Sequence, residues 1–470
     1  MQRSTAITLV ALATLAAVAT PLVIEPAAAA DTRAFVTTTD YSSGGLRRID
    51  LDTRTVLAGE TAVHTDTRLR WYGGQVYVVN RIGQDNIQIV NPTTLATVRQ
   101  FSTGNGSNPA DIAFASPSKA YVTLYDRAGL LIVNPQTGGT LGTVALGAFA
   151  DADGIPEMDH MERVGPWLLV ALQRLDRSNG YAPTDSSLVV VVDTRTDTVF
   201  DVNPAQPGTQ GFRLTGKNPV TPFMLDSASG RLLIGCAGSY AALDGGIEWI
   251  DPLGFRSLGY AATEEALGGN LSGIAWYTAA HSYAVVYDAS FNGLLVSWSA
   301  ASASKLATIF SSGGLGDLGL DDRDELYVCD GTFTSPGVRV WRAGSDVPLA
   351  GPLDTGLPPS QITFDRVSGD AAPVEPAAPA LSFAPPRPNP AREAVRFEIT
   401  LARAGELTLE VFDLTGRRVR VVSSELRSAG PADKTWDLGD AAGARVAPGV
   451  YVVRARAAGG EAVRRVVVLR

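Results

Sequence analysis

The chain has 470 residues, of which 45% are hydrophobic and only two are cysteines, so a disulfide framework is not expected. Its formal charge of −9 is uneven. Residues 381–470 hold 15 Lys and Arg against 10 Asp and Glu, residues 1–30 are neutral, and residues 31–380 therefore carry −9 − 5 = −14. An acidic body of this kind repels nucleic acid and anionic membranes and suits cation binding, so no nucleic-acid partner is expected.

Residues 1–30 have the pattern of an export signal. Arg3 precedes the apolar run AITLVALATLAAVA, and the small residues up to Ala30 offer a cleavage site. The run is too short and too rich in alanine to predict a membrane span, and no later stretch reaches about eighteen apolar residues. We therefore expect a mature chain without a transmembrane segment, secreted or associated with the outer-membrane surface.

A repeated pattern of two apolar strands around a polar turn follows. A strand-like run stands about ten residues upstream of most copies. A period near 45 residues with about four short strands is typical of β-propeller blades. The pattern predicts an all-β, seven-bladed β-propeller over residues 31–366. The copies begin at Ala34, Val76, Ala120, Leu168, Leu232, Tyr283 and Leu326.

The two ends of this repeat region complement each other. The first copy lacks its upstream strand, whereas PSQITFD at 359–365 has no copy after it. We predict that 361–365 pair with 33–37, because this pairing closes the ring and removes two exposed sheet edges. Cys236 and Cys329 fall on similar strands of the fifth and seventh copies, so we expect them not to form a disulfide.

One stretch carries a family resemblance. SNPADIAFASPSKAYVTLYDRAGLLIVNPQTG resembles the YVTN-type propeller repeat, in which a proline precedes the inner strand and an apolar Tyr-Val pair marks the next strand. The resemblance covers residues 32–366 and implies the propeller fold. It leaves the function open, because such propellers include surface proteins, binding modules and lactonases.

Residues 367–386 are rich in Pro and Ala and are predicted to form an extended linker. Alternating strands then predict a small sandwich over 387–470, with Trp436 and Phe412 in its core. The motifs PNPAREAVRFEITL, LEVFDLTGRRVR and WDLGDAAGARVAPGVYVVRARAAGG resemble the immunoglobulin-like C-terminal sorting domain of type IX secretion cargo, close to the Ig-like domain of flagellar hook-capping proteins. The resemblance implies a delivery address read by outer-membrane secretion machinery. The chain ends in VVVLR instead of a Lys-rich stop, so simple attachment is the alternative.

The stretch DADGIPEMDH at 151–160 precedes the inner strand of the fourth copy, and a long loop at 173–185 follows its second strand. Strands alternate in direction, so these two insertions are predicted to meet on one face beside the central channel. Long loops on a rigid scaffold commonly carry function. The predicted ligand-binding residues are Glu157, Asp159, His160, Gln173, Arg174, Tyr181 and Tyr240.

A cation is a second possibility at this face, because hard cations prefer carboxylate and amide oxygens. The predicted calcium ligands are Glu157, Asn218, Asn270 and Asp317, at equivalent connections. These residues also begin turns without any metal. If no cation is present, Arg163, Arg174 or Arg177 is expected to neutralise the acids of 151–160.

Aromatic residues mark most loops of the predicted face: Tyr41, Tyr125, Tyr181, Tyr240, Phe291 and Phe333. Rings and acids together favour an extracellular glycan, peptide or small molecule as ligand, although rings also pack between loops. We predict a monomeric surface protein that binds such a ligand. The alternative is a metal-dependent, lactonase-like hydrolase on the same face, with His160 as general base.

Overall fold

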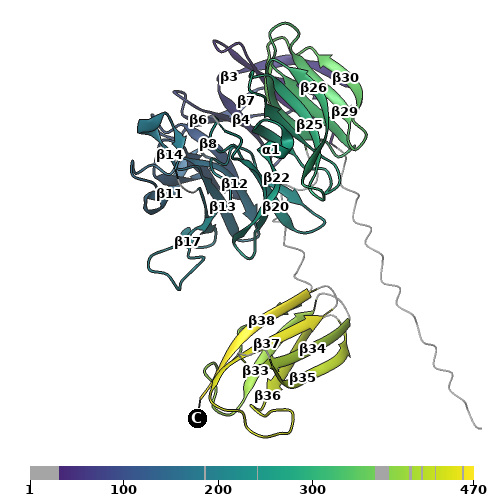
Figure 1. The fold of residues 1–470 in the computed structure, drawn as a ribbon. Coiled ribbons are helices and arrows are strands. Elements are labelled where there is room, and N and C mark those ends of the chain that lie inside the picture. The colour runs from purple at the N-terminus through teal and green to yellow at the C-terminus, as the bar shows by residue number, and fades with distance from the viewer. Residues whose placement is uncertain are drawn as a thin grey trace, which may run out of the picture.

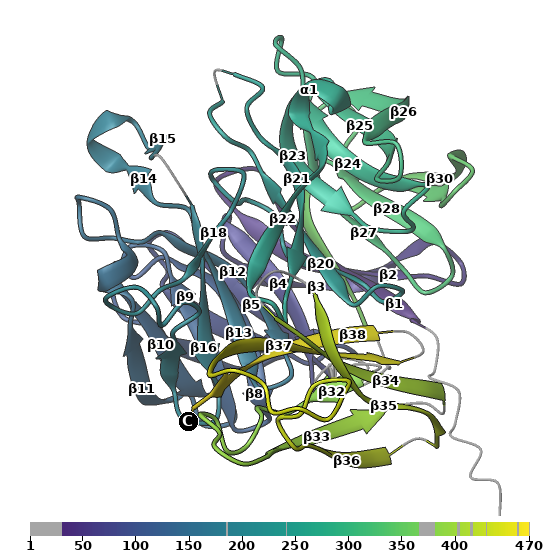
Figure 2. The same cartoon turned by 60° about the horizontal axis from the view of Figure 1, so that its bottom comes forward.

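The computed structural model describes residues 31–184, 187–240, 242–365, 381–401, 405–413, 417–428, 430–457 and 460–469. The predicted signal at 1–30 and most of the predicted linker lie outside the described residues. Nearly all regular structure is strand, so the all-β class is confirmed, with a β-propeller body and an Ig-like C-terminal domain (Figures 1 and 2).

Among the described residues of the propeller body, the strands form seven antiparallel sheets of four or five strands, here called sheets 1 to 7, and one separate two-stranded hairpin. Sheet 1 holds β31 (Pro359–Phe364), β1 (Arg33–Thr39), β2 (Gly44–Asp50) and β3 (Thr55–Val63). Sheet 2 holds β4 (Thr67–Tyr72), β5 (Gln75–Asn80), β6 (Asn86–Val90) and β7 (Thr97–Ser102). Sheet 3 holds β8 (Pro109–Ser116), β9 (Lys119–Leu124), β10 (Gly129–Asn134) and β11 (Gly139–Ala145).

Sheet 4 is the largest, with β12 (Met158–Val164), β13 (Trp167–Leu172), β16 (Leu188–Asp193), β17 (Thr198–Phe200) and the side strand β18 (Phe212–Arg213). Sheet 5 holds β19 (Met224–Asp226), β20 (Arg231–Cys236), β21 (Gly246–Asp251) and β22 (Arg256–Thr263). Sheet 6 holds β23 (Asn270–Ala275), β24 (Ser282–Tyr287), β25 (Gly293–Ser299) and β26 (Ser304–Ser312). Sheet 7 holds β27 (Leu315–Leu320), β28 (Glu325–Asp330), β29 (Gly337–Arg342) and β30 (Val347–Leu353).

The second strand of each sheet is a short, nearly continuous apolar run, such as VYVV in β5 and LYVC in β28. These strands are buried on both faces, because each sheet packs between two neighbours, and the outermost strands such as β7 are largely exposed. The cores therefore lie between adjacent sheets. Cys236 and Cys329 are free and buried within these cores.

The two ends of the propeller body meet in sheet 1, where β31 pairs with β1 in the register Ala34↔Phe364 to Thr37↔Gln361. The predicted pairing of 361–365 with 33–37 is therefore found, and Figure 1 shows the purple first strands beside the green last ones. Asp365 extends the contact, because its buried carboxylate accepts hydrogen bonds from the backbone amides of Thr32 and Arg33, both at 2.7 Å.

Short elements fill some connections of the body. The long loop of sheet 4 contains a small hairpin, β14 (Leu175–Asp176) and β15 (Ala182–Pro183), around the 3-10 turn η2 (Arg177–Asn179). A second 3-10 turn, η1 (Gly147–Phe149), follows β11, and α1 (Glu264–Leu267) follows β22. Within the described part of the chain, no helix has the length and apolar character needed to span a membrane.

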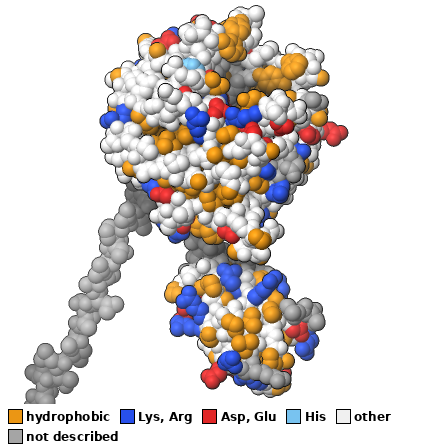
Figure 3. Space-filling model, turned by 90° about the vertical axis from the view of Figure 1, so that its left-hand side faces the viewer, with side chains coloured by type: hydrophobic (Ala, Val, Ile, Leu, Met, Phe, Trp, Pro, Cys, Tyr) orange, Lys and Arg blue, Asp and Glu red, His pale blue; other side chains and the backbone are white. Residues whose placement is uncertain are grey.

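The C-terminal domain is built from two sheets. One holds β32 (Leu381–Phe383), β33 (Val395–Leu401) and β36 (Gly430–Trp436), and the other holds β35 (Arg418–Arg427), β34 (Gly405–Phe412), β37 (Gly449–Ala457) and β38 (Gly460–Val468). In β33 buried and exposed residues alternate strictly, as expected of a strand with one face on a core. Arg and Lys side chains stand out on the surface of this domain in Figure 3.

Two sequence predictions for this domain need adjustment. β32 pairs with β33 and contributes Leu381 and Phe383 to the core, so residues 381–386 belong to the domain and not to the linker. Trp436 is buried as predicted, whereas Phe412 is only partly buried. The Arg454 guanidinium lies 4.4 Å from the centre of the Phe412 ring, so this ring supports a surface arginine.

Candidate functional site

One face of the propeller body collects the loops that join the second and third strands of each sheet, here called B–C loops. Antiparallel alternation brings the segments before the innermost strands to the same face. A pocket of about 610 Å³ opens there, in the size range of small-ligand sites. It is lined by Arg68, Arg81, Tyr125, Asp159, Gln173, Leu175, Gly180, Tyr181, Asn218, Val220, Tyr240, Asn270, Leu271, Ser272, Tyr287, Asp288 and Phe291.

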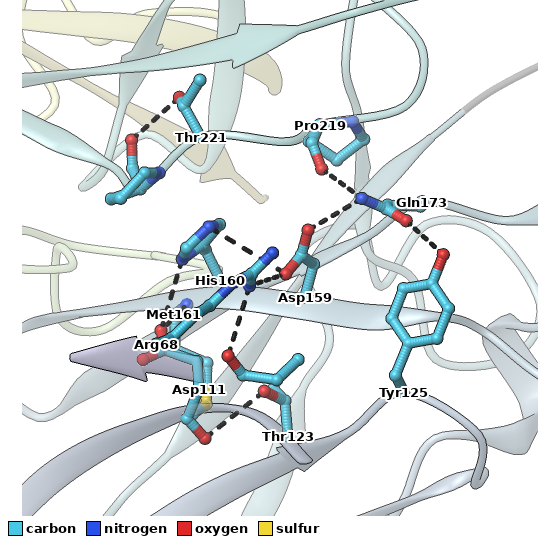
Figure 4. Close-up of polar contacts among 12 residues, drawn as sticks. Arg68, Asp111, Thr123, Tyr125, Asp159, His160, Met161, Gln173, Pro219 and Thr221 are labelled. Atoms are coloured by element: carbon cyan, nitrogen blue, oxygen red, sulfur yellow. Dashed lines mark hydrogen bonds and ion pairs between the residues drawn. The ribbon is translucent and has the colours of Figure 1, made fainter. Parts of the chain in front are cut away.

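Charged side chains on the inner strands form the floor of the pocket. Arg68 on β4 donates to the Asp159 carboxylate on β12 and to the carbonyl of Ala110, 3.2 Å away (Figure 4). Burial acts to raise the pKa of Asp159, but the charge and hydrogen bond of Arg68, together with other neighbouring groups such as Arg81, hold that pKa below its usual range. The Asp159 carboxylate is therefore ionised, and it is already paired with Arg68.

Gln173 links this ion pair to the rim of the pocket. Its amide nitrogen donates to the second oxygen of Asp159 at 2.7 Å and to the carbonyl of Pro219 at 2.8 Å. Its amide oxygen accepts from the Tyr125 hydroxyl at 2.7 Å (Figure 4). Both polar atoms of this side chain make hydrogen bonds, and through them Gln173 connects sheets 3, 4 and 5.

A second ion pair lies further along the inner strands. Two guanidinium nitrogens of Arg70 donate to one carboxylate, with Nε and Nη2 at 2.7 and 2.6 Å from the two oxygens of Asp111. The backbone amides of Ile112 and Met161 also donate to Asp111. Although burial opposes ionisation, Arg70 keeps the pKa of Asp111 well below its usual range.

His160 lies between the two ion pairs and does not line the pocket. Its Nδ1 is 3.8 Å from Asp111 and its Nε2 is 4.0 Å from Asp159, which is longer than a hydrogen bond (Figure 4). Burial, reinforced by the charge of Arg68, lowers the pKa of His160, so the ring is neutral at neutral pH. A general base must reach the proton it removes, and this geometry does not favour the hydrolase alternative.

Glu157 is fully buried, but its carboxylate faces the B–C loop of sheet 4 and not the pocket. It accepts from Arg177 Nε at 2.7 Å and from the backbone amide of Leu175 at 3.0 Å. Burial raises the pKa of Glu157 to about 7, against the opposing effect of Arg177. Of the three arginines proposed to neutralise this stretch, Arg177 is the one that pairs with Glu157. Buried carboxylates require such compensation, which explains why Glu157 does not reach into the pocket.

The four predicted calcium ligands are divided between different surroundings. Asn218 and Asn270 line the pocket, whereas Glu157 is paired with Arg177, and Asp317 accepts from the backbone amides of Leu318 and Ile362. Among the described residues, no group of three or more His, Cys, Asp and Glu side chains is placed to hold a metal ion. Calcium takes about six to eight oxygens. Because Glu157 and Asp317 are engaged elsewhere, only the amide oxygens of Asn218 and Asn270 remain at the pocket, and this donor set does not fit a calcium site.

Two of the three remaining predicted residues belong to the rim of the pocket. Tyr181 and Tyr240 line the pocket, and Arg174 does not. Arg177 organises this part of the rim by bonding Asp126 at 2.8 Å and lying 5.8 and 5.6 Å from the ring centres of Tyr125 and Tyr181. The long loop of sheet 4 is thereby tied to the neighbouring loop of sheet 3.

Sequence reasoning missed Arg68, Arg81 and Tyr287 as pocket residues, and Arg70 and Asp111 below them. The sequence does contain a signal for the missed residues that lie on inner strands. Arg68 and Arg70 alternate in the strand TRLRWY, and Asp111 interrupts the strand ADIAFA. Charged residues on strands that line a channel must pair across it, so these positions point to the polar centre of the ring.

Comparison with known proteins identifies a family for the C-terminal domain only. A family model described as FlgD Ig-like domain matches residues 391–461, and no curated protein matches the chain. Hydrazine synthase of Kuenenia stuttgartiensis is 13% identical with a TM-score of 0.46, covering 66% of this chain and 95% of that one. The β-propeller domain of Cps50 (Swd1) from Myceliophteria thermophila is 14% identical with a TM-score of 0.44, covering 66% and 93%.

A third structure covers both parts of the chain. PorZ, a bacterial surface component of the type IX secretion system of Porphyromonas gingivalis, is 14% identical with a TM-score of 0.38, covering 92% of this chain and 64% of that one. At these values the structural likenesses carry no argument about activity or partners. The chain is a β-propeller followed by an Ig-like C-terminal domain that matches the FlgD Ig-like family model.

Proposed function

We propose that the protein is an exported or cell-surface β-propeller that binds an extracellular ligand in the pocket of the B–C loop face. The Ig-like domain is its address for the outer-membrane type IX secretion machinery. The motif series of residues 387–470 supports the second part. The pocket supports the first, because it unites side chains from sheets 2 to 6 around one opening.

Unsatisfied acceptors in the pocket carry the proposal. The side-chain oxygens of Asn218 and Asn270 are buried and accept no hydrogen bond from the described residues. A buried polar atom without a partner costs about 1–3 kcal/mol, so native proteins rarely keep one without a reason. A ligand that brings N–H or O–H groups to these two oxygens supplies the missing donors.

The rim offers apolar surface beside these acceptors. Tyr240 and Phe291 line the pocket and are largely exposed, whereas the arginine and carboxylate of the floor neutralise each other. This combination suits an uncharged ligand with an apolar face and several hydrogen-bond donors, such as a sugar or a small peptide, more than a strongly charged one.

A thermal-shift screen of the purified chain tests this proposal. The probes are neutral sugars and oligosaccharides, short peptides and lactones. A ligand at a hundred times its Kd is expected to stabilise the protein by roughly 2.7 kcal/mol. Asn218→Ala and Tyr240→Ala are expected to abolish the shift, whereas the control Leu306→Ala on the outer strand β26 keeps it. A shift that survives both pocket variants would place the ligand elsewhere and refute the assignment.

The address is tested separately in the native host. Removal of residues 381–470 is expected to leave the protein inside the outer membrane, and fusion of these residues to an unrelated exported protein is expected to deliver it outside. Normal surface arrival of the truncated chain would contradict the address, without bearing on the pocket.

A further inference from the structure

Five aromatic side chains stand out from the B–C loops. Each comes from a different sheet, and together they are called the aromatic crown. Single exposed rings are ordinary on a protein surface, whereas a group of them on one face commonly marks a binding site. The exposed fractions are 80% for Tyr41, 50% for Tyr181, 68% for Tyr240, 81% for Phe291 and 66% for Phe333.

The crown is held in place and not merely exposed. Each ring lies on a turn in which an aspartate carboxylate accepts backbone amides. Asp40 accepts from Ser42 and Ser43 beside Tyr41, and Asp288 accepts from Ser290 and Asn292 around Phe291. Asp176, Asp244 and Asp330 make the corresponding contacts in the loops of Tyr181, Tyr240 and Phe333.

The backbone at three of these rings is also unusual. Tyr41, Tyr181 and Phe291 have φ angles of 69°, 62° and 60°. Bulky residues rarely adopt this left-handed conformation, which costs of order 1–3 kcal/mol and persists where the surrounding structure enforces it. Three sheets thus present a ring outward from a residue in the left-handed region, although their turns differ, which implies that the position of the ring matters.

The crown reaches beyond the pocket. Tyr181, Tyr240 and Phe291 line it, whereas Tyr41 and Phe333 do not. The latter two rings lie 6.2 Å apart between centres, on the adjoining loops of sheets 1 and 7. Burial raises the pKa of Tyr287 at the pocket wall, and Tyr41 lies close enough to add to that effect. The Tyr41–Phe333 pair is therefore a second apolar site beside the first.

The surface between the rings is polar, and its charged groups are the aspartates of these turns, such as Asp40 and Asp288. Ser42, Ser43, Ser290, Asn292 and Thr332 separate them, and the neighbouring aspartates are engaged by backbone amides. Among the described residues of the B–C loops, large exposed aliphatic side chains are few, namely Ile82 and Leu243. A protein partner would require a continuous apolar centre, and an anionic lipid surface would require basic residues. Rings spaced by hydroxyl and amide groups instead match sugars, which have apolar C–H faces and polar hydroxyl edges.

We propose that the aromatic crown is a platform for a neutral polysaccharide chain, with one part of the chain in the pocket and a further part on the Tyr41–Phe333 pair. This inference rests on the proposed function of the pocket and adds the class and the length of its ligand. The pocket and the Tyr41–Phe333 pair lie on the same face, but the pair is outside the pocket lining. A ligand must therefore be an extended chain to contact both.

Affinity electrophoresis of the full chain tests the inference. The gels contain hydroxyethylcellulose, xylan, galactomannan or starch, with polygalacturonate as the acidic contrast. We expect retardation by at least one neutral polymer and none by polygalacturonate. Retardation by the acidic polymer alone, or binding of peptides without any neutral polymer, would overturn the ligand class.

Calorimetry with fragments of the retarding polymer tests the length. The variant Tyr41→Ala with Phe333→Ala is expected to weaken polymer binding about tenfold while leaving di- and trisaccharide binding unchanged, and Tyr240→Ala is expected to weaken both. Ile82→Ala, which removes an exposed aliphatic side chain from the same face, is the matched control and should change neither.

The outcomes separate the two proposals. If the double variant binds polymer normally while Tyr240→Ala does not, the pocket stands and the extended platform is refuted. If Tyr240→Ala and Asn218→Ala bind every probe as the wild type does, the proposed function itself has failed. Circular dichroism and melting of each variant confirm that the fold is intact before either conclusion is drawn.

Discussion

The propeller body and the Ig-like domain bury different kinds of groups. The Ig-like domain has a single apolar core, and Glu410 is its one buried charged residue among those described. The propeller body divides its apolar core between pairs of sheets and keeps a charged centre that includes Asp111 and Asp159. The difference follows from shape, because a sandwich closes on itself whereas a ring of sheets encloses a channel.

This contrast explains where binding chemistry arises. Inner strands converge on the channel with side chains that cannot all be apolar, since water and loops reach both mouths. Arginine–carboxylate pairs fill this space, and each must be complete because a buried charge without its partner is costly. The sandwich has no such space, because its two sheets pack directly on one apolar core. Four changes test this contrast, taken from the largest expected effect to the smallest.

Deletion of residues 359–365 is expected to have the largest effect. It removes β31 and the Asp365 contacts, and so leaves β1 with an open edge. We expect loss of cooperative melting of the propeller and aggregation, while the Ig-like domain still folds. Light scattering and calorimetry measure both. A soluble deletion variant with an unchanged melting temperature would show that the ring does not depend on this strand.

Asp111→Ala is expected to destabilise the propeller by about 3–5 kcal/mol, because it leaves Arg70 without its partner. Glu410→Ala is the matched change in the Ig-like domain. Its partners Arg418 and Arg454 are 60% and 26% exposed, so both remain solvated without it, and we expect a loss of only about 1 kcal/mol. Urea unfolding of each variant gives the two values. Equal losses would contradict the distinction between the two interiors.

Glu162→Gln is expected to have an intermediate, pH-dependent effect. Burial raises the pKa of Glu162 to about 7, above its unfolded value near 4.5. The folded state therefore binds the proton more tightly, and wild-type stability falls as the pH rises from about 4.5 to about 7. The variant should gain about 1–2 kcal/mol relative to wild type at pH 8 and nothing at pH 4. Melting curves across this range decide the point, and a gain independent of pH would exclude titration of Glu162 as the cause.

Removal of residues 381–470 is expected to have the smallest effect on the propeller. The Pro- and Ala-rich linker predicts few contacts across it, so the melting temperature of the body should change by less than about 2 °C. Scanning calorimetry of the truncated and full chains provides the comparison. A large drop would reveal that the Ig-like domain stabilises the ring directly.

Repeats and alternation were sufficient to predict the all-β class, the pairing of the chain ends and the face that carries the pocket. They placed Asp159, Gln173, Tyr181, Tyr240, Asn218 and Asn270 on that face, and all six line the pocket. They could not predict that Glu157 turns to Arg177 or that Asp159 pairs with Arg68. Strand periodicity gives the face of a residue, whereas the partner across a channel depends on how far each sheet is rotated.

The pairing of β1 with β31 in sheet 1 also determines when the propeller can finish folding. Thr32 and Asp365 are 333 positions apart in the chain, so their contact closes the longest loop in the propeller body. Hairpins within sheets 2 to 7 close short loops and form early, whereas contacts of such long range form slowly. During synthesis the first strand to emerge must wait for the last. The propeller therefore completes its fold only after nearly all of its own sequence is present, and until then β1 is the segment most exposed to wrong pairing.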